Sequence, residues 1–264
     1  MLKYLFVTIS IFDMKKYKTG LVLSGGGTRG FAHLGVIAAL FEKGIKPDVI
    51  SGTSAGAIAG AFAAAGKNPH DILGLLKKGS FFNYTKLQIP RDGLMKFDGL
   101  KEVLHKEIPA KNLEDLEIPF FVTISNLNKG TVEYRNTGPL GETVLASSSI
   151  PILFAPVKID GDLYVDGGLL DNIPIEPILM DCEQIIVSNI SPITPMEKIK
   201  NLIEIVTRTF YMSVNSNMKR VKKYATIYIE PDGIDKYEIL SRTHADELYE
   251  LGYNSTIKIL DGHQ

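Results

Sequence analysis

One short stretch of this 264-residue chain restricts its fold more than any other. Ile50 to Gly60 reads ISGTSAGAIAG, in which an apolar run leads into Gly-Thr-Ser-Ala-Gly and almost only small residues follow. Ser54 stands at the centre of Gly-Thr-Ser-Ala-Gly, between Gly52 and Gly56. The pattern G-x-S-x-G between a strand and a helix is typical of a nucleophile elbow, a sharp turn that exposes the serine hydroxyl. The plainer interpretation is a turn leading into a tightly packed helix, and the two interpretations are compatible.

The elements around this stretch alternate between strands and helices. The predicted strands are Thr19 to Ser24, which is buried, and Asp48 to Ser51. Apolar spacing predicts helices over Phe31 to Lys43, Ala57 to Ala65 and His70 to Lys78. Such alternation predicts an α/β domain with a parallel sheet.

The rest of the chain continues this mixture. Phe81 to Phe97 is rich in aromatic residues without a clear period, which indicates a long loop that either packs as a small separate core or covers a site. Two hairpins are predicted, around Asn128-Lys129-Gly130 and around Asp160-Gly161-Asp162. The other predicted elements are a helix over 98–107, a strand over 183–190, a long helix from Met196 to Tyr224, a strand over 225–231 and a helix from Thr243 to Leu260. No linker, repeat or low-complexity tract divides the chain, so we expect one domain over residues 19–264.

Composition excludes several classes of protein. A hydrophobic share of 45% and a charged share of 22% are those of an ordinary globular domain with a substantial core. A net charge of -1 gives no electrostatic reason to expect nucleic-acid binding. The single cysteine, Cys182, excludes an internal disulfide framework and a cysteine-based metal cluster, and we expect it to be a small buried hydrophobe. The five histidines show no metal-ligand spacing, so neither a metal nor another cofactor is predicted.

Residues 1–18 contain a short apolar run behind a basic residue. This arrangement is similar to a signal peptide, but no Ala-x-Ala cleavage pattern follows, Asp13 interrupts the run, and the run is too short to span a bilayer. We therefore expect a tail, an extra strand or a start at Met14. A cytoplasmic protein, peripheral to a membrane at most, is favoured over a secreted one.

A glycine-rich loop, GGGTRG from Gly25 to Gly30, joins the first strand to the first helix. It fits G-x-G-x-x-G, but a dinucleotide site also needs an acidic residue at the end of the second strand, and Asp48 stands at its start. A P-loop would need Gly-Lys-Ser/Thr, which is absent from the sequence. Backbone N–H groups at a helix N-terminus favour negative charge, and a transient charge there would make this loop an oxyanion hole. Arg29 would add positive charge, or is a solvated loop residue.

A serine nucleophile needs a base. In α/β-hydrolases the order is serine, acid, histidine, which Asp166 with His244 or His263 would satisfy. Those folds carry several strands before the elbow, whereas about two are predicted before Ser54. The other candidate base is Asp166 alone, followed by Gly167 and Gly168, although Asp-Gly is most often a plain turn.

Four stretches together resemble one family. GGGTRGFAHLGVIAAL, GTSAG, ASSSIPILFAPV and YVDGGLLDNIP, in this order, are similar to patatin-like phospholipases, particularly the short bacterial members. The resemblance extends from about Thr19 to Asn189, and no transferable motif follows from Ser191 onward. It implies a three-layer α/β sandwich whose mainly parallel central sheet is flanked by helices.

The same resemblance implies the chemistry. Ser54 would be the nucleophile and Asp166 the general base of a Ser–Asp dyad without histidine. The implied oxyanion-hole loop contains Gly25, Gly26, Gly27, Arg29 and Gly30. The expected activity is that of a serine acyl hydrolase on lipid acyl esters, of phospholipase A type, with transient contact to a membrane surface and no nucleic-acid partner. The alternatives are a small-ester or thioester hydrolase without a membrane role, and a binding or regulatory module with weak turnover.

Overall fold

The computed structural model describes most of the chain. The described residues are 15–78, 98–195, 218–239 and 243–262, together with 199, 202, 205, 208, 209, 212 and 241. The predicted aromatic loop over 81–97, nearly all of the N-terminal tail, most of the predicted long helix over 196–217 and His263 lie outside these residues.

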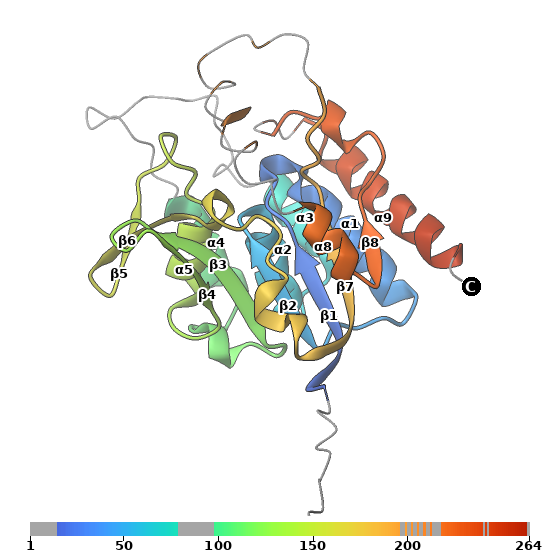
Figure 1. Cartoon of the computed structure of the whole chain (residues 1–264), viewed down its shortest axis with the longest axis horizontal. Coiled ribbons are helices and arrows are strands. Elements are labelled where there is room, and N and C mark those ends of the chain that lie inside the picture. Colours follow the sequence, from blue (N-terminus) through green and yellow to red (C-terminus); the bar gives the residue numbers. More distant parts are fainter. Residues whose placement is uncertain are drawn as a thin grey trace, which may run out of the picture.

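An eight-stranded mixed sheet forms the centre of the described structure (Figure 1). β1 (Tyr17–Leu23) lies inside the sheet, between β2 (Val49–Thr53) and β7 (Cys182–Ser188), and is parallel to both. β8 (Ile227–Ile229) pairs in parallel with β7, and β3 (Phe120–Asn126) pairs in parallel with β2. The predicted parallel sheet is therefore confirmed for these five strands. The connection after β1 runs to β2 on one side, whereas the connection after β7 runs to β8 on the other. The carboxyl ends of β1 and β7 are therefore the position where ligands bind in open α/β sheets.

The two predicted hairpins supply the antiparallel part of the sheet. β4 (Thr131–Arg135) pairs with β3, and β5 (Val157–Ile159) pairs with β6 (Asp162–Asp166). β6 in turn pairs antiparallel with the end of β3. The strand order is β5-β6-β3-β2-β1-β7-β8, with β4 on the other edge of β3.

The described α-helices are α1 (Phe31–Glu42), α2 (Ala55–Ala64), α3 (Pro69–Lys78), α4 (Asp98–Glu107), α5 (Leu140–Ser147), α6 (Glu176–Leu179), α8 (Met218–Tyr224) and α9 (Ala245–Asp261). Several of them begin and end close to the predicted boundaries, namely α1, α3, α4 and α9. Two departures matter for the site. α2 begins at Ala55, directly after Ser54, rather than at Ala57 as predicted, and α5 was not predicted.

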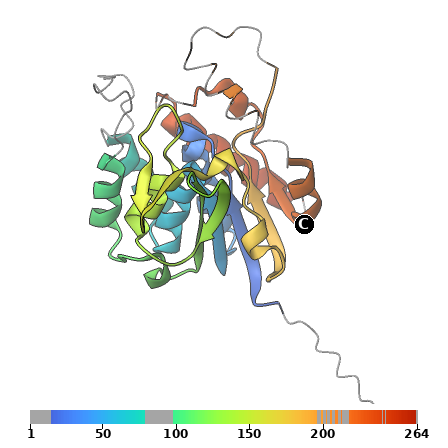
Figure 2. The same ribbon diagram turned by 60° about the vertical axis from the view of Figure 1, so that its left-hand side comes forward.

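Side chains that alternate along β1 face two different cores. Leu21 and Leu23 pack with α1, α2, α3, α4, α5 and α9 in the larger core. Val22 points the other way and packs with Ile178 of α6 and Val221 of α8. The sheet thus lies between a thick and a thin helical layer (Figures 1 and 2), which confirms the predicted three-layer arrangement.

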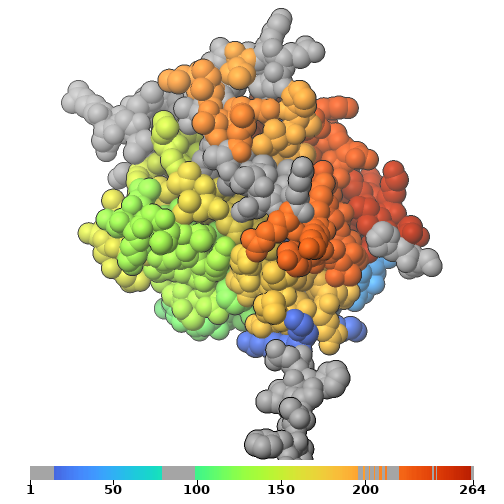
Figure 3. Space-filling model, in the orientation of Figure 1, coloured from blue at the N-terminus to red at the C-terminus, as the bar shows by residue number. Residues whose placement is uncertain are grey.

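The C-terminal segments close this arrangement. α9 packs on α1 so tightly that a Cβ added at Gly35 would lie 1.9 Å from the carbonyl oxygen of Tyr249, and one at Gly252 would lie 2.1 Å from that of Ala32. α8 and β8, orange in Figure 3, lie against the gold residues around β7. Cys182 is buried, as predicted. No helix among the described residues combines the length and apolarity that crossing a bilayer requires.

Candidate active site

Ser54 and Asp166 lie where two strands meet end to end along one edge of β3. β2 runs parallel to β3 and pairs Thr53 with Thr123, whereas β6 runs antiparallel and pairs Asp166 with Ile124. Thr123 and Ile124 are adjacent on β3, so β2 and β6 approach the same point of this edge from opposite directions. Each of the two strands ends at that point. This arrangement brings the residue after β2 beside the last residue of β6.

Ser54 occupies a sharp turn between β2 and α2. Its φ of 53° and ψ of −117° are unusual for a residue with a side chain, as expected for a nucleophile elbow. A Cβ added at Gly52 would lie 2.5 Å from the carbonyl oxygen of Gly56, and one at Gly56 would lie 2.2 Å from that of Leu23. The two glycines therefore also serve close packing of α2 on the sheet, and both interpretations of this stretch hold.

The hydroxyl of Ser54 donates a hydrogen bond to the carboxylate of Asp166. The distance from Ser54 Oγ to Asp166 Oδ2 is 2.7 Å, and the other carboxylate oxygen accepts the N–H of Gly168 at 2.8 Å. Ser54 is 5% exposed and Asp166 is 1% exposed. Gly167 makes the turn after Asp166 possible, because a Cβ there would lie 2.1 Å from the carbonyl oxygen of Thr123.

Burial dominates the electrostatics of Asp166. Loss of solvation raises the pKa of its carboxyl group to about 7, although the hydrogen bonds from Ser54 and Gly168 act in the opposite direction. A carboxylate with an ordinary pKa near 4 is a poor proton acceptor for a hydroxyl, whereas one near 7 is much better matched to that role. The short hydrogen bond and the raised pKa both suit Asp166 to accept a proton from Ser54.

Three consecutive serines at the end of α5 hold the backbone of both residues. Ser147 Oγ accepts the N–H of Ser54 at 2.9 Å, and Ser148 Oγ donates to the carbonyl oxygen of Ser54 at 3.4 Å. The carbonyl oxygen of Ser149 accepts the N–H of Asp166 at 2.9 Å. Sequence reasoning gave these serines no role. A run of three serines beside an apolar stretch could have indicated such a role, because polar side chains that are buried need hydrogen-bond partners.

The glycine loop lies against Ser54 but differs from expectation at its first residue. The N–H of Gly25 donates to the carbonyl oxygen of Asn172 at 3.1 Å, so this amide is already engaged. Within the described part of the chain, the N–H groups of Gly26 and Gly27 have no hydrogen-bond acceptor. A Cβ added at Gly25 would lie 3.3 Å from Ser54 Cβ, which shows how close the loop comes. Of the three consecutive glycine amides, those of Gly26 and Gly27 are thus left without an acceptor in the described structure.

Arg29 is not the solvated loop residue that one interpretation expected. Its side chain is buried, Nε donates to the carbonyl oxygen of Tyr237 at 2.9 Å, and Nη2 donates to that of Asp235 at 2.9 Å. The N–H of Thr28 donates to the carbonyl oxygen of Ile239 at 2.8 Å. Residues 235–239, in the part of the chain without any recognised motif, therefore hold the glycine loop in place.

Asp171 and Asn172 connect the loop to the elbow, a role that sequence reasoning missed. The hydroxyl of Thr53 donates to the carbonyl oxygen of Asp171 at 3.0 Å, and Asn172 receives the bond from Gly25. Tyr134 OH donates to the Asp171 carboxylate at 2.7 Å. The short segment after the Asp-Gly-Gly turn thus holds both the elbow and the glycine loop in position.

His244 does not complete a triad. Its side chain is 46% exposed and Nδ1 lies 2.8 Å from Glu247 Oε1, while the Ser54 hydroxyl is bound to Asp166. The structure therefore gives no support to a Ser–Asp–His triad that contains His244.

Comparison with known proteins agrees with the fold and with these motifs. The family model described as patatin-like phospholipase matches residues 21–179, which is more than half of the chain. The chain belongs to the patatin-like phospholipase family. Within this patatin-like segment lie the glycine loop, the elbow and the Asp-Gly-Gly turn, whereas residues 235–239 lie beyond it.

Curated relatives of this patatin-like chain include fungal proteins. It is 29% identical to lysophospholipase nte1 of Emericella nidulans over 267 residues, covering 89% of this chain and 17% of the relative. It is 30% identical to lysophospholipase nte1 of Aspergillus fumigatus, covering 89% of this chain and 18% of the relative. The chain thus spans less than a fifth of the length of these relatives.

A solved structure shares the fold. The crystal structure of VipD from Legionella pneumophila superposes with a TM-score of 0.57 at 17% identity, covering 94% of this chain and 67% of that protein. At this level of identity the likeness shows a common fold alone. It agrees with the mixed sheet and flanking helices of this patatin-like chain.

Proposed function

We propose that this chain is a serine acyl hydrolase of phospholipase A type, which cleaves lipid acyl esters with Ser54 as nucleophile and Asp166 as general base. The observation that carries the proposal is the 2.7 Å hydrogen bond from Ser54 Oγ to the buried Asp166 carboxylate. Membership of a phospholipase family and the elbow geometry of Ser54 support it.

In the first half of the proposed reaction, the Asp166 carboxylate accepts the proton of the Ser54 hydroxyl. Ser54 Oγ then bonds to the ester carbonyl carbon, and the carbonyl oxygen becomes an oxyanion. The tetrahedral intermediate collapses, the bond to the leaving alcohol breaks, and the proton on Asp166 passes to that alcohol. An acyl-enzyme on Ser54 remains.

In the second half, the same aspartate acts on water. Asp166 accepts a proton from a water molecule as its oxygen attacks the acyl-enzyme carbonyl, and the proton returns to Ser54 Oγ when the acid leaves. The N–H groups of Gly26 and Gly27 stabilise the oxyanion in both halves, which in such enzymes is often the largest single contribution to the rate. Their lack of another acceptor in the described structure supports this role.

Lipid substrates are favoured by exposed apolar side chains that lie a few residues along the chain from Ser149 and Asp166, which are joined by a backbone hydrogen bond. Ile152, three residues after Ser149, is 67% exposed and has a φ of 73°, an unusual conformation for a β-branched residue. Leu170, four residues after Asp166, is 43% exposed. We propose that these side chains touch the surface of a lipid aggregate. The names of the fungal relatives make a lysophospholipid the first natural substrate to test.

The test is covalent labelling by a fluorescent fluorophosphonate, combined with hydrolysis of p-nitrophenyl esters and of lysophosphatidylcholine. The variants are Ser54→Ala, Asp166→Asn and, as a control on an exposed residue, His244→Ala. We expect labelling and turnover to vanish in the first two variants and to persist in the third. Loss in His244→Ala alone would instead indicate a histidine base.

The alternatives give different outcomes in the same experiment. Turnover of soluble esters that is indifferent to micelles, with no release of fatty acid from lysophosphatidylcholine, would indicate a small-ester or thioester hydrolase. Folded wild-type protein that is neither labelled nor active would contradict the proposal and favour a binding module.

A further inference from the structure

Three hydroxyl side chains form a row across neighbouring strands on one face of the sheet. Thr53 of β2 pairs with Thr123 of β3, and Thr123 pairs with Tyr134 of β4, so the three side chains point to the same face. The two outer hydroxyls bind one residue, Asp171. Thr53 Oγ1 donates to its carbonyl oxygen at 3.0 Å, and Tyr134 OH donates to its carboxylate at 2.7 Å. The hydroxyl of Thr123 has no hydrogen-bond partner in the described part of the chain, so Thr53 and Tyr134 are the members of the row that hold Asp171.

Asp171 belongs to the segment that connects the parts of the proposed active site. Its N–H donates to the carbonyl oxygen of Gly167, in the Asp-Gly-Gly turn, at 2.9 Å. The carbonyl oxygen of the next residue, Asn172, accepts the N–H of Gly25 in the glycine loop at 3.1 Å. Thr53, which binds the same segment, directly precedes the nucleophile. A displacement of this segment would therefore change the distances between the turn, the glycine loop and the elbow.

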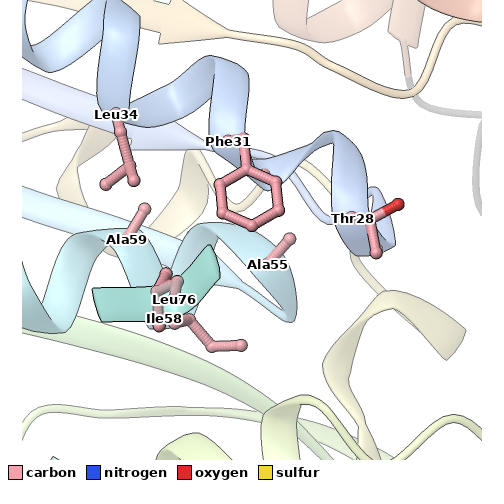
Figure 4. Close-up of a pocket in the computed structure, with 9 residues that line it drawn as sticks. Thr28, Phe31, Leu34, Ala55, Ile58, Ala59 and Leu76 are labelled. Carbon is pink, nitrogen blue, oxygen red and sulfur yellow. The ribbon is translucent and has the colours of Figure 1, made fainter. Parts of the chain in front are cut away.

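The helix that follows the elbow is held in a different way. Apolar side chains from α1, α2 and α3 pack together in the larger core, among them Phe31, Ala55, Ile58 and Leu76 (Figure 4). Residues 171–172 carry polar side chains and belong to neither of the two hydrophobic cores. Their position therefore depends on hydrogen bonds.

The Asp171 carboxylate depends on the hydroxyl of Tyr134. Asp171 is 9% exposed, and burial raises the pKa of its carboxyl group, whereas the hydrogen bond from Tyr134 acts in the opposite direction. A second hydrogen bond to this carboxylate, from the N–H of Ile173, is longer, at 3.3 Å. Without the hydroxyl, a nearly buried carboxylate would lack its shorter hydrogen bond, which is costly. Asp171 would then move towards water or take up a proton, and in both cases the tie to β4 is lost.

We propose that Tyr134 is a positioning residue for catalysis, which acts through the Asp171 carboxylate to fix residues 171–172 and thereby the position of the glycine loop relative to Ser54. The inference rests on the proposed function, in which Ser54 is the nucleophile and the glycine loop holds the oxyanion. Tyr134 acts at a distance, because its hydroxyl is bound to Asp171 and the hydroxyl of Ser54 is bound to Asp166.

The experiment measures kcat and KM separately for p-nitrophenyl butyrate in wild type, Tyr134→Phe, Asp171→Ala and the double variant. We expect Tyr134→Phe to lower kcat about tenfold with little change in KM, because a misplaced glycine loop weakens binding of the transition state only. In the Asp171→Ala background we expect the same substitution to have no effect, because the group through which the hydroxyl acts is gone. An unchanged kcat in Tyr134→Phe, or an equal loss with and without Asp171, would overturn the inference.

Tyr253→Phe is the matched control. Tyr253 is half-buried like Tyr134, and its hydroxyl also donates to a carboxylate, that of Glu42, at 2.6 Å. This pair joins α9 to the last residue of α1, at the other end of that helix from the glycine loop. The same atom is thus removed from the same kind of bond, and we expect kcat to stay at the wild-type value. An equal fall in kcat in both variants would mean that the loss does not come from positioning by Tyr134.

Amide hydrogen exchange, followed by NMR, separates this inference from the proposed function because it needs no turnover. We expect Tyr134→Phe to speed exchange at the N–H groups of Gly25 and Asp171 and to leave the amides of β7 unchanged, whereas Tyr253→Phe changes neither. This result in a protein whose Ser54 is neither labelled by a fluorophosphonate nor needed for turnover would refute the proposed function alone. Ser54-dependent turnover, with kcat and exchange unchanged in Tyr134→Phe, would refute the positioning role alone.

Discussion

His33 Nε2 lies 2.8 Å from the carbonyl oxygen of Ser24, the residue directly before the glycine loop. Because a carbonyl oxygen only accepts hydrogen bonds, Nε2 carries the proton, and Nδ1 accepts from the hydroxyl of Ser188 at 2.9 Å. His33 is fully buried, and loss of solvation lowers the pKa of its imidazole to about 4, despite the hydrogen bond to Ser24. A neutral histidine thus joins α1 to the ends of β1 and β7, next in sequence to the glycine loop.

This histidine predicts sensitivity to acid. Its folded-state pKa lies below the ordinary value of 6.5, so its contribution to stability is present above pH 6.5 and is lost as the pH falls towards 4. The difference of about 2.5 units corresponds to a free energy of unfolding of about 3 kcal/mol at most. Urea unfolding at pH 7.5 and pH 5 measures the part of this loss that occurs above pH 5, about 2 kcal/mol. His33→Gln is the comparison, because a neutral amide does not titrate. An equal loss of stability in acid for both proteins would contradict the prediction.

Asp166 predicts the pH dependence of activity. The base must be a carboxylate, and its pKa is about 7, so kcat/KM is expected to rise with pH around a midpoint near 7. A soluble ester measured from pH 5 to 9 gives this profile. Activity that is already constant above pH 5.5 would mean that Asp166 is not the titrating base.

The carboxyl group of Asp166 changes stability with pH in the opposite direction to His33: it lowers stability as the pH rises. Because its folded-state pKa is raised from 3.8 to about 7, its contribution to stability is full below pH 3.8 and is lost as the pH rises through 7. Asp166→Asn is therefore expected to unfold at a higher temperature than wild type at pH 8 while it loses activity. Thermal unfolding at pH 5 and pH 8 tests this, and a difference that does not grow with pH would count against it.

The unusual backbone conformation of Ser54 leads us to expect that two inactive variants differ in stability. Ser54→Ala and Ser54→Gly both remove the hydroxyl, but only glycine adopts a φ of 53° with little strain. Strained backbone of this kind costs about 1–3 kcal/mol. We expect Ser54→Gly to be the more stable variant by about 1 kcal/mol in urea unfolding. Equal stability would indicate that the elbow is relaxed in the alanine variant.

The bonds of Arg29 to residues 235 and 237 lead us to expect that the C-terminal third of the chain affects the chemical step. A lysine at this position has one amine and cannot reproduce the two bonds to the carbonyl oxygens of Asp235 and Tyr237. We expect Arg29→Lys to lower kcat about tenfold with little change in KM, because a displaced oxyanion hole weakens transition-state binding only. Arg135→Lys, which changes the hydrogen bonds of Arg135 to Glu133 and Tyr164, is the control. A rise in KM at constant kcat would refute the positioning role.

Ile152 predicts dependence on lipid surfaces. Ile152→Ser removes an exposed apolar side chain three residues after Ser149, whose carbonyl oxygen accepts the N–H of Asp166. We therefore expect slower hydrolysis of lysophosphatidylcholine in micelles and unchanged hydrolysis of p-nitrophenyl butyrate. Met180→Ser is the control, since Met180 is 73% exposed and follows α6 in the thin layer of the sandwich. Equal effects of the two variants on micellar substrate would remove Ile152 from the proposed contact.

Local patterns determined much of this protein. Apolar spacing and glycines predicted β1, β2, α1 and both hairpins to within a few residues, because such patterns act over one or two turns of chain. The elbow at Ser54 was also readable from the sequence, since a hydroxyl between two glycines at the end of an apolar strand is a local arrangement. Sequence reasoning named Asp166 among the candidate bases, but only resemblance to a family singled out its pairing with Ser54 without a histidine, because no pattern relates two residues that are 112 positions apart.

Tertiary structure decided the rest. Only the pairing of β2 and β6 along the same edge of β3 brings Ser54 and Asp166 together, and only burial raises the pKa of that carboxyl group. Asn172 and residues 235–239 hold the glycine loop through carbonyl oxygens, which every residue possesses and which therefore leave no mark in the sequence. Backbone groups become specific only when the fold brings them into position.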